Sequence, residues 1–160
     1  MNDEFFMGEA IAQAQLAAAR DEVPVGAVVV LNGEIIGRGF NQPISSHDPT
    51  AHAEVVALRD AAKRIANYRL ADAELFVTIE PCTMCSGALT HARIKRLVYG
   101  AAEPKAGVVH SQPGAFNAAY LNHKIEVTAG VLAQECSAVM QAFFARRREE
   151  KKALKNNRDE

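Results

Sequence analysis

Long apolar runs, an even number of cysteines and an excess of one charge are all missing from this sequence. No segment approaches the roughly 18 to 20 apolar residues of a membrane-spanning helix, so no membrane anchor is expected. No basic stretch precedes the first apolar residues, which argues against a secretory signal. Its 3 cysteines are an odd number and do not suggest an extracellular disulfide framework. We therefore expect a reducing, cytoplasmic location.

The charge of the chain is nearly balanced, with 18 Lys or Arg against 19 Asp or Glu. Neither disorder nor a general attraction to polyanions follows from this balance. Hydrophobic residues make up 49% of the 160 residues, which is enough for one substantial core. We expect a single domain over residues 1–160, in which any binding of nucleic acid comes from a local patch.

Periodicity and turn residues divide the chain into alternating helices and strands. Helices are predicted over residues 3–19, about 51–66, 83–92 and about 131–155, and strands over 25–31, 34–40, 74–79, 95–101 and 124–128. Asn32 and Gly33 join the first two strands, and this pair tolerates the positive φ angles of a type I′ hairpin turn. Residues 107–122 show no regular pattern. The order predicts an α/β fold with a mixed, largely parallel five-stranded sheet covered on both faces.

Metal-binding side chains stand at the starts of two of these helices. His52 and Glu54 open the helix after residue 50, and Cys82 and Cys85 open the helix that follows the 74–79 strand. Both helix starts are expected at the edge of the sheet where open α/β folds bind ligands. One imidazole and two thiolates make three ligands for zinc, and the fourth tetrahedral position is left for water. The pattern predicts a catalytic zinc site.

The charge of this site explains why a carboxylate is needed beside it. Two thiolates cancel the charge of Zn²⁺ and weaken its ability to acidify a bound water molecule. Helix N-termini favour thiolates and a developing hydroxide, and Glu54 is placed to take the proton and deliver it later. His-x-Glu followed by Pro-Cys-x-x-Cys is also the signature of zinc-dependent nucleobase deaminases.

Taken alone, each residue has a simpler interpretation. Cys82 and Cys85 without His52 could be a thioredoxin-like redox pair, and Glu54 could be an acid favoured by the helix dipole. A zinc ribbon would need a second Cys-x-x-Cys pair, which the sequence lacks. Cys136 lies on the apolar face of the last helix and is expected in the core. Only the combination favours a deaminase.

Over nearly its whole length the chain resembles the bacterial tRNA-specific adenosine deaminases. The resemblance rests on Val23-Pro24-Val25-Gly26-Ala27, Asn41, Asp48-Pro49-Thr50-Ala51-His52-Ala53-Glu54, Glu80-Pro81-Cys82-Thr83-Met84-Cys85-Ser86-Gly87-Ala88, Leu121-Asn122-His123, and Phe143-Phe144 with the arginines after them. It implies a three-layer α/β/α domain of the cytidine deaminase-like fold, a homodimer, and one zinc ion per subunit. It also implies hydrolytic deamination of adenosine to inosine at the wobble position, in the anticodon stem-loop of tRNA.

The resemblance further implies which residues hold the RNA. The target base would be bound by Asn41 and lined by the main chain at Ala53 and Cys82, and the flanking RNA would be touched by Glu103, Lys105 and Phe144. The family commonly has Asp at the position of Glu103, and residues 110–114 depart from its usual pattern.

A basic segment closes the chain. Residues 143–160 contain 7 Lys or Arg against 4 Asp or Glu. Arg146, Arg147 and Arg148 directly follow Phe143-Phe144, where the apolar face of the helix stops. A solvated helix face is the simpler interpretation of such a run. We expect these arginines to contact RNA phosphates while an aromatic ring stacks on a base.

Two other functions share parts of this pattern. A deaminase of free guanine, cytosine or a nucleoside such as cytidine would use the same metal chemistry, because the shape of the pocket selects the base. A metal-stabilised RNA-binding module would keep the three ligands but would have no use for Glu54. The sequence favours the enzyme that acts on tRNA.

Overall fold

The computed structural model describes residues 2–112, 114–118 and 121–158. In chain order its elements are α1 (Asp3–Ala19), β1 (Gly26–Leu31), β2 (Glu34–Phe40), α2 (Ala53–Ile65), β3 (Glu74–Ile79), α3 (Thr83–Ala92), β4 (Arg96–Ala101), β5 (Glu126–Ala129) and α4 (Ala133–Arg158). Every predicted helix and strand is present, and the bounds of the elements are close to those expected from the sequence.

The strands form one five-stranded sheet in the order β2-β1-β3-β4-β5. Asn32 and Gly33 have φ angles of 53° and 79°, so the predicted hairpin turn is confirmed and β2 runs back along β1. Helix α2 then carries the chain to the other side of β1, where β3 pairs with β1 in antiparallel orientation. Strands β3, β4 and β5 are parallel. Four strands therefore point one way and β1 alone points the other, which is a mixed and largely parallel sheet.

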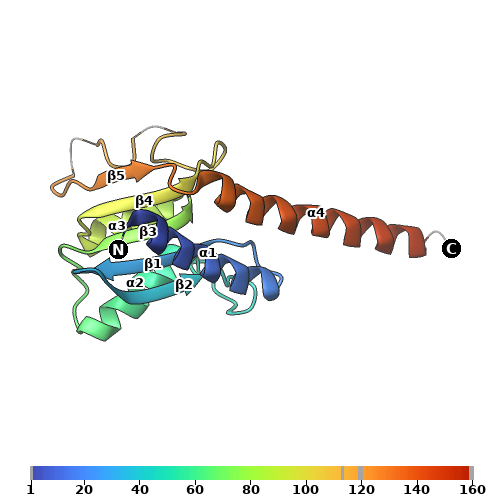
Figure 1. Ribbon diagram of the computed structural model, residues 1–160, viewed down its shortest axis with the longest axis horizontal. Helices are drawn as coiled ribbons and strands as arrows, with labels where there is room; N and C mark the ends of the chain where they lie inside the picture. The colour runs from blue at the N-terminus through green and yellow to red at the C-terminus, as the bar shows by residue number, and fades with distance from the viewer. Residues whose placement is uncertain (1, 113, 119–120, 159–160) are drawn as a thin grey trace.

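Helices cover both faces of this sheet (Figure 1). Alternate residues of the strands divide between two cores, as the period of a strand requires. Val28, Phe76 and Val98 pack with α1 and with Cys136 of α4. Val29 and Val77 pack with α2 and α3 on the opposite face. The three-layer α/β/α architecture follows, and the prediction that Cys136 lies in the core is confirmed.

Helix α4 extends well beyond the sheet (Figure 1). The basic helix expected at about 131–155 is present and continues to Arg158. Good helix formers and an Arg146–Glu150 pair one turn apart support this exposed end. Within the described ranges, no helix is both long and apolar enough to cross a membrane.

The carboxyl ends of the parallel strands bring several loops to one edge of the sheet. Asn41 directly follows β2, Glu80 directly follows β3, and Glu103 lies just beyond β4. Helix α2 begins at this edge, where it packs closely on β2. A Cβ atom on Gly39 would lie only 2.5 Å from the carbonyl oxygen of Ala53, so glycine permits that approach. Open α/β sheets bind their ligands at such an edge.

Candidate metal centre and substrate pocket

Two helix starts bring the three predicted metal ligands together. His52 is the N-cap of α2, Cys82 is the N-cap of α3, and Cys85 lies in the first turn of α3. Their ligand atoms all lie within 4.8 Å of one another. The Nδ1 atom of His52 is 3.6 Å from Cys82 Sγ and 3.5 Å from Cys85 Sγ. Tetrahedral zinc with ordinary Zn–N and Zn–S bonds requires about 3.6 Å between these atoms. The geometry therefore fits zinc.

Protonation in this cluster also indicates a cation site. Hydrogen bonds with Cys85 and then with His52 lower the pKa of Cys82 to about 3. The hydrogen bond to Cys82 and burial raise the pKa of Cys85 above its ordinary value, and the hydrogen bond with Cys82 raises that of His52. The two sulfur atoms and the imidazole nitrogen are thus hydrogen-bonded to one another around one point. A divalent cation at that point would displace the shared protons and bind both thiolates.

Glu54 lies in the first turn of α2 and is 3% exposed. Burial raises the pKa of Glu54 to about 7, against the effect of a hydrogen bond to its own backbone and of the neighbouring Cys85 and His52. A carboxyl group with this pKa can both accept and release a proton near neutral pH. The position two residues after a metal ligand places it beside the centre.

Asn41 is held against the start of α2. Its Oδ1 atom accepts a hydrogen bond of 2.9 Å from the main-chain N–H of Ala53, and its own N–H donates to Val25. This hydrogen bond fixes the orientation of the amide, so that its Nδ2 group is a donor. Asn41 therefore offers a hydrogen-bond donor that suits an acceptor nitrogen or oxygen of a base.

Two buried carboxylates hold the loops on either side of these residues. Glu22 is 1% exposed and accepts hydrogen bonds from the main-chain N–H groups of Ile44 and Ser45, at 3.2 and 2.7 Å. Burial alone would raise the pKa of Glu22, but the hydrogen bonds from Ser45 and Ile44 outweigh it, and the pKa lies below its ordinary value. This carboxylate fixes the loop between Asn41 and α2.

Glu80 has the same role in the loop that follows β4. Its carboxylate accepts main-chain hydrogen bonds from Glu103, Val109, His110 and Ser111, and one from the hydroxyl of Ser111. Burial raises the pKa of Glu80, but these hydrogen bonds, led by those from Ser111, lower it to about 2. The loop carries Glu103 and Lys105, which the resemblance assigns to the RNA. Glu103 is half-buried and Lys105 is exposed.

The basic end of the chain is divided between two environments. Phe144 is 42% exposed, whereas Arg146 and Arg147 bind the segment after α1 through Asp21. Among the described residues, Arg148 has no hydrogen bond or ion pair and lies with Phe144 along a groove on α4. Arg147 also lines this groove. Arg146 and Arg147 thus have partners within the chain, and the contact of the three arginines with RNA stays a prediction.

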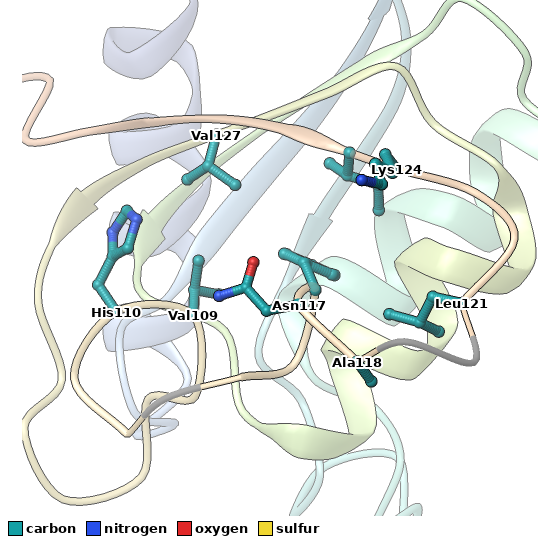
Figure 2. Close-up of a pocket in the computed structure, with 9 residues that line it drawn as sticks. Val109, His110, Asn117, Ala118, Leu121, Lys124 and Val127 are labelled. Carbon is teal, nitrogen blue, oxygen red and sulfur yellow. The ribbon is translucent and has the colours of Figure 1, made fainter.

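A separate cavity of about 340 Å³ lies between the irregular segment after β4 and strand β5. Figure 2 shows Val109 and Val127 facing this space from the loop and from the strand. Its lining contains none of the three metal-binding side chains, so it is distinct from the metal centre.

Comparison with known proteins decides the family. The model of the cytidine and deoxycytidylate deaminase zinc-binding region matches residues 1–101, which include all three metal-binding side chains. A tRNA-specific adenosine deaminase from Haemophilus influenzae is 53% identical over 96% of this chain and 89% of its own length. The chain belongs to the tRNA-specific adenosine deaminases.

Solved structures agree with this membership. A structure described as a tRNA:A34 deaminase, from work on A-to-I editing at the wobble position of transfer RNA, has a TM-score of 0.81 and 43% identity. It covers 84% of this adenosine deaminase chain and 98% of its own. A guanine deaminase from Nitrosomonas europaea has a TM-score of 0.79 at 24% identity, over 90% and 85% of the two chains, which shows the shared fold.

The roles of Glu22 and Glu80 in this adenosine deaminase were not predicted from the sequence. Glu80 belongs to the motif before Cys82, yet nothing local shows that its partners lie 23 to 31 residues further along the chain. The one feature of the sequence that indicates burial of Glu80 is its position between an apolar strand and a proline, where a charged side chain has little access to water. Glu22 lies two residues before Pro24, in the segment that follows α1, and nothing near it in the sequence indicates that it is buried.

Proposed function

We propose that this chain deaminates adenosine at the wobble position of tRNA to inosine by adding water and releasing ammonia. The observation that carries this proposal is the set of His52, Cys82 and Cys85 with the buried Glu54 beside it. A structural zinc site has no need of a buried carboxylate that is not a ligand. The family to which the chain belongs supports RNA as the substrate.

We propose that His52, Cys82 and Cys85 hold one zinc ion per subunit. Zinc bound by three protein ligands acidifies a water molecule at its open position. Both cysteines lie at the start of α3, where the partial positive charge of the helix favours thiolates. Since the thiols must stay reduced to bind metal and the substrate is tRNA, we infer a cytoplasmic location.

Glu54 is the proton carrier of the proposed reaction. It takes one proton from the attacking water as the new C6–O bond forms, and passes it to N1 of the purine ring. It then carries the second proton, from the new C6 hydroxyl group, to the departing amino group. The C6–N6 bond breaks, the C6 carbonyl of inosine forms and ammonia leaves. Its burial keeps bulk water from competing for these protons, and its position beside His52 brings it to the reacting atoms.

The base is selected by groups at the carboxyl edge of the sheet. Asn41 offers its Nδ2 donor to an acceptor on the purine, because the hydrogen bond from Ala53 fixes the orientation of the amide. The main chain at Ala53 and Cys82 would contact the base between the two helix starts. These fixed polar groups hold the base, while the position of the metal decides which ring carbon is attacked.

The flanking nucleotides are held from two sides in this proposal. Glu103 and Lys105 approach from the loop after β4, and Phe144 and Arg148 approach from α4. The exposed ring of Phe144 supplies a stacking surface and Arg148 a charge for a phosphate. Arg146 and Arg147 contribute chiefly by holding α4 in place.

The outer face of α3 supports a homodimer, which we propose as the functional assembly. Helix α3 has no Asp, Glu, Lys or Arg, although Thr83, Met84 and Gly87 are exposed. Solvent-facing helix surfaces usually carry charged side chains. A Cβ atom on Gly87 would meet nothing within 4 Å in the chain itself. Gly87→Glu should therefore give a folded monomer by sedimentation, and an unchanged association state would contradict the interface.

The substrate class is tested by offering zinc-loaded protein an anticodon stem-loop beside free adenosine, guanine, cytosine and cytidine. Chromatography of the digested products identifies what has been deaminated. The proposal predicts inosine in the stem-loop and little conversion of the free compounds. Xanthine from guanine, with the stem-loop unchanged, would favour a free-base deaminase. Binding of RNA without any product would favour a metal-stabilised RNA-binding module.

A further inference from the structure

The carboxylate of Glu80 accepts five hydrogen bonds, all from the loop that follows β4. Oε1 accepts from the N–H of Glu103 at 3.1 Å and from the hydroxyl of Ser111 at 2.5 Å. Oε2 accepts from the N–H groups of Val109, His110 and Ser111 at 3.1, 2.8 and 2.9 Å. One side chain therefore ties both ends of the segment 103–111 to the end of β3.

This arrangement is buried and has no counter-charge. Glu80 is 2% exposed, and no Lys or Arg in the described ranges forms an ion pair with it. Its charge is balanced by main-chain N–H groups and one hydroxyl. A buried charge is costly unless it is fully hydrogen-bonded, so the segment 103–111 must keep this conformation to satisfy it.

Gly107 completes the enclosure around the carboxylate. A Cβ atom on Gly107 would lie 2.5 Å from the carboxyl carbon of Glu80 and 2.6 Å from both its Oε1 atom and the Glu103 carbonyl oxygen. The N–H of Gly107 also donates to that carbonyl at 2.8 Å. Any larger residue here would push the loop away from the carboxylate.

The same segment is fixed relative to the metal centre. The N–H of Val108 donates to the carbonyl of Pro81 at 3.1 Å, and Pro81 directly precedes Cys82. The N–H of Glu80 donates to Ala101 at 2.8 Å, which joins the ends of β3 and β4. A displacement of this loop would therefore change its distance from the bound base.

We propose that Glu80 is a positioning residue for the RNA, which holds the loop 103–111 where Glu103 and Lys105 meet the nucleotides beside the target adenosine. The inference rests on the proposed function, since it concerns the same substrate. Glu80 is too deeply buried to touch the RNA. It acts on binding through the loop and takes no part in the chemical step.

Glu80→Gln tests this role with little change of shape. The amide oxygen can still face the N–H groups of residues 109–111, and the hydroxyl of Ser111 can turn to accept a hydrogen bond. The amide nitrogen then faces the N–H of Glu103, and two donors cannot pair. The variant should raise the KM for the stem-loop by about tenfold, as expected when one hydrogen bond to a charged group is removed. Its kcat and zinc content should stay unchanged.

Two further variants serve as controls. Gly107→Ala keeps the carboxylate but forces the loop outward, so it should raise KM in the same way and decides the matter if Glu80→Gln does not fold. Ser111→Ala removes one hydroxyl and leaves the 4 main-chain hydrogen bonds, so its effect should be much smaller. Melting temperatures and zinc analysis accompany each kinetic measurement.

The outcomes are separable. A lower melting temperature with unchanged KM in both Glu80→Gln and Gly107→Ala would make Glu80 purely structural and overturn the inference. Loss of zinc with lower kcat and unchanged KM would show that Glu80 acts on the metal centre instead, which would also overturn the inference.

Fluorescence anisotropy with a stem-loop that carries guanosine at the target position measures binding without turnover. If the unmodified protein neither binds nor deaminates the stem-loop, the proposed function itself fails.

Discussion

The Nη2 atom of Arg146 lies 3.0 Å from Asp21 Oδ1 and 3.2 Å from the carbonyl oxygen of Ala18. Arg147 donates to the carbonyl of Asp21 at 2.9 Å. These acceptors stand at the end of α1, where the Ala18 carbonyl already accepts from the N–H of Asp21 and where the helix dipole favours positive charge. The contact explains how the extended helix α4 is anchored, and it occupies two of the arginines that the sequence assigns to RNA.

Substitution of Arg148 should therefore have a different effect from substitution of Arg146 and Arg147. Arg148→Ala should weaken binding of the stem-loop and reduce the slope of log K against log salt by about 0.7, because the guanidinium no longer neutralises one phosphate. Fluorescence anisotropy at several salt concentrations gives both quantities. Arg146→Ala with Arg147→Ala should instead increase hydrogen exchange at the start of α4. An unaltered affinity and slope in Arg148→Ala would mean that this part of α4 is only a solvated surface.

Zinc should be bound at one ion per chain and should require both thiolates. Cys85→Ala leaves a histidine and a single thiolate, which is too few ligands for a stable tetrahedral site. Metal analysis after gel filtration should show a large loss of zinc in this variant. Cys136→Ala is the matched control, because Cys136 packs in the other core, against α1. A protein free of zinc, with Cys82 and Cys85 in a reversible disulfide, would point to redox chemistry.

Glu54→Gln should abolish most turnover while zinc and fold remain. The amide has the shape of the carboxyl group but cannot accept the proton. Loss of general acid–base catalysis typically costs about 10² to 10⁴ in rate. Single-turnover kinetics on the stem-loop, with zinc content measured in parallel, would detect it. Near-normal turnover, or a loss of metal equal to that in Cys85→Ala, would contradict the assigned role.

Local signals predicted much of this molecule. Asn32 and Gly33 lie next to each other, and His52, Cys82 and Cys85 stand at helix starts that their own surroundings reveal. The contacts that shape the loops were not predictable in this way. Glu80 pairs with a segment that has no periodicity, and Arg146 meets Asp21 at a separation of 125 residues. Such contacts depend on how the layers pack, which no short stretch of sequence records.

Glu22 should contribute to stability in a way that depends on pH. The pKa of Glu22 in the folded protein lies below its ordinary value of 4.5, because of the hydrogen bonds from Ser45 and Ile44 and the nearby charge of Arg20. Its contribution is therefore fully present above about pH 4.5 and is lost as pH falls through the lower folded value. Glu22→Gln should reduce the free energy of unfolding at pH 7 by about 1 to 3 kcal/mol.

Urea unfolding of both proteins between pH 7 and pH 3 measures this dependence. The difference between them should shrink as pH falls below 4.5, the ordinary pKa of the side chain. Release of zinc at low pH affects both proteins and cancels in the difference. A difference that stays constant over this range would show that the carboxylate charge does not hold the loop.

We propose that Asn41 and the zinc centre act together on one adenosine in a tRNA loop. The most direct measurement incubates zinc-loaded protein with an anticodon stem-loop and maps inosine along it by mass spectrometry of nuclease fragments. The Glu54→Gln variant serves as the control for contaminating activity. We predict inosine at the first anticodon position and at no other adenosine. An unmodified stem-loop, under conditions in which the same protein deaminates free guanine or cytidine, would contradict the account.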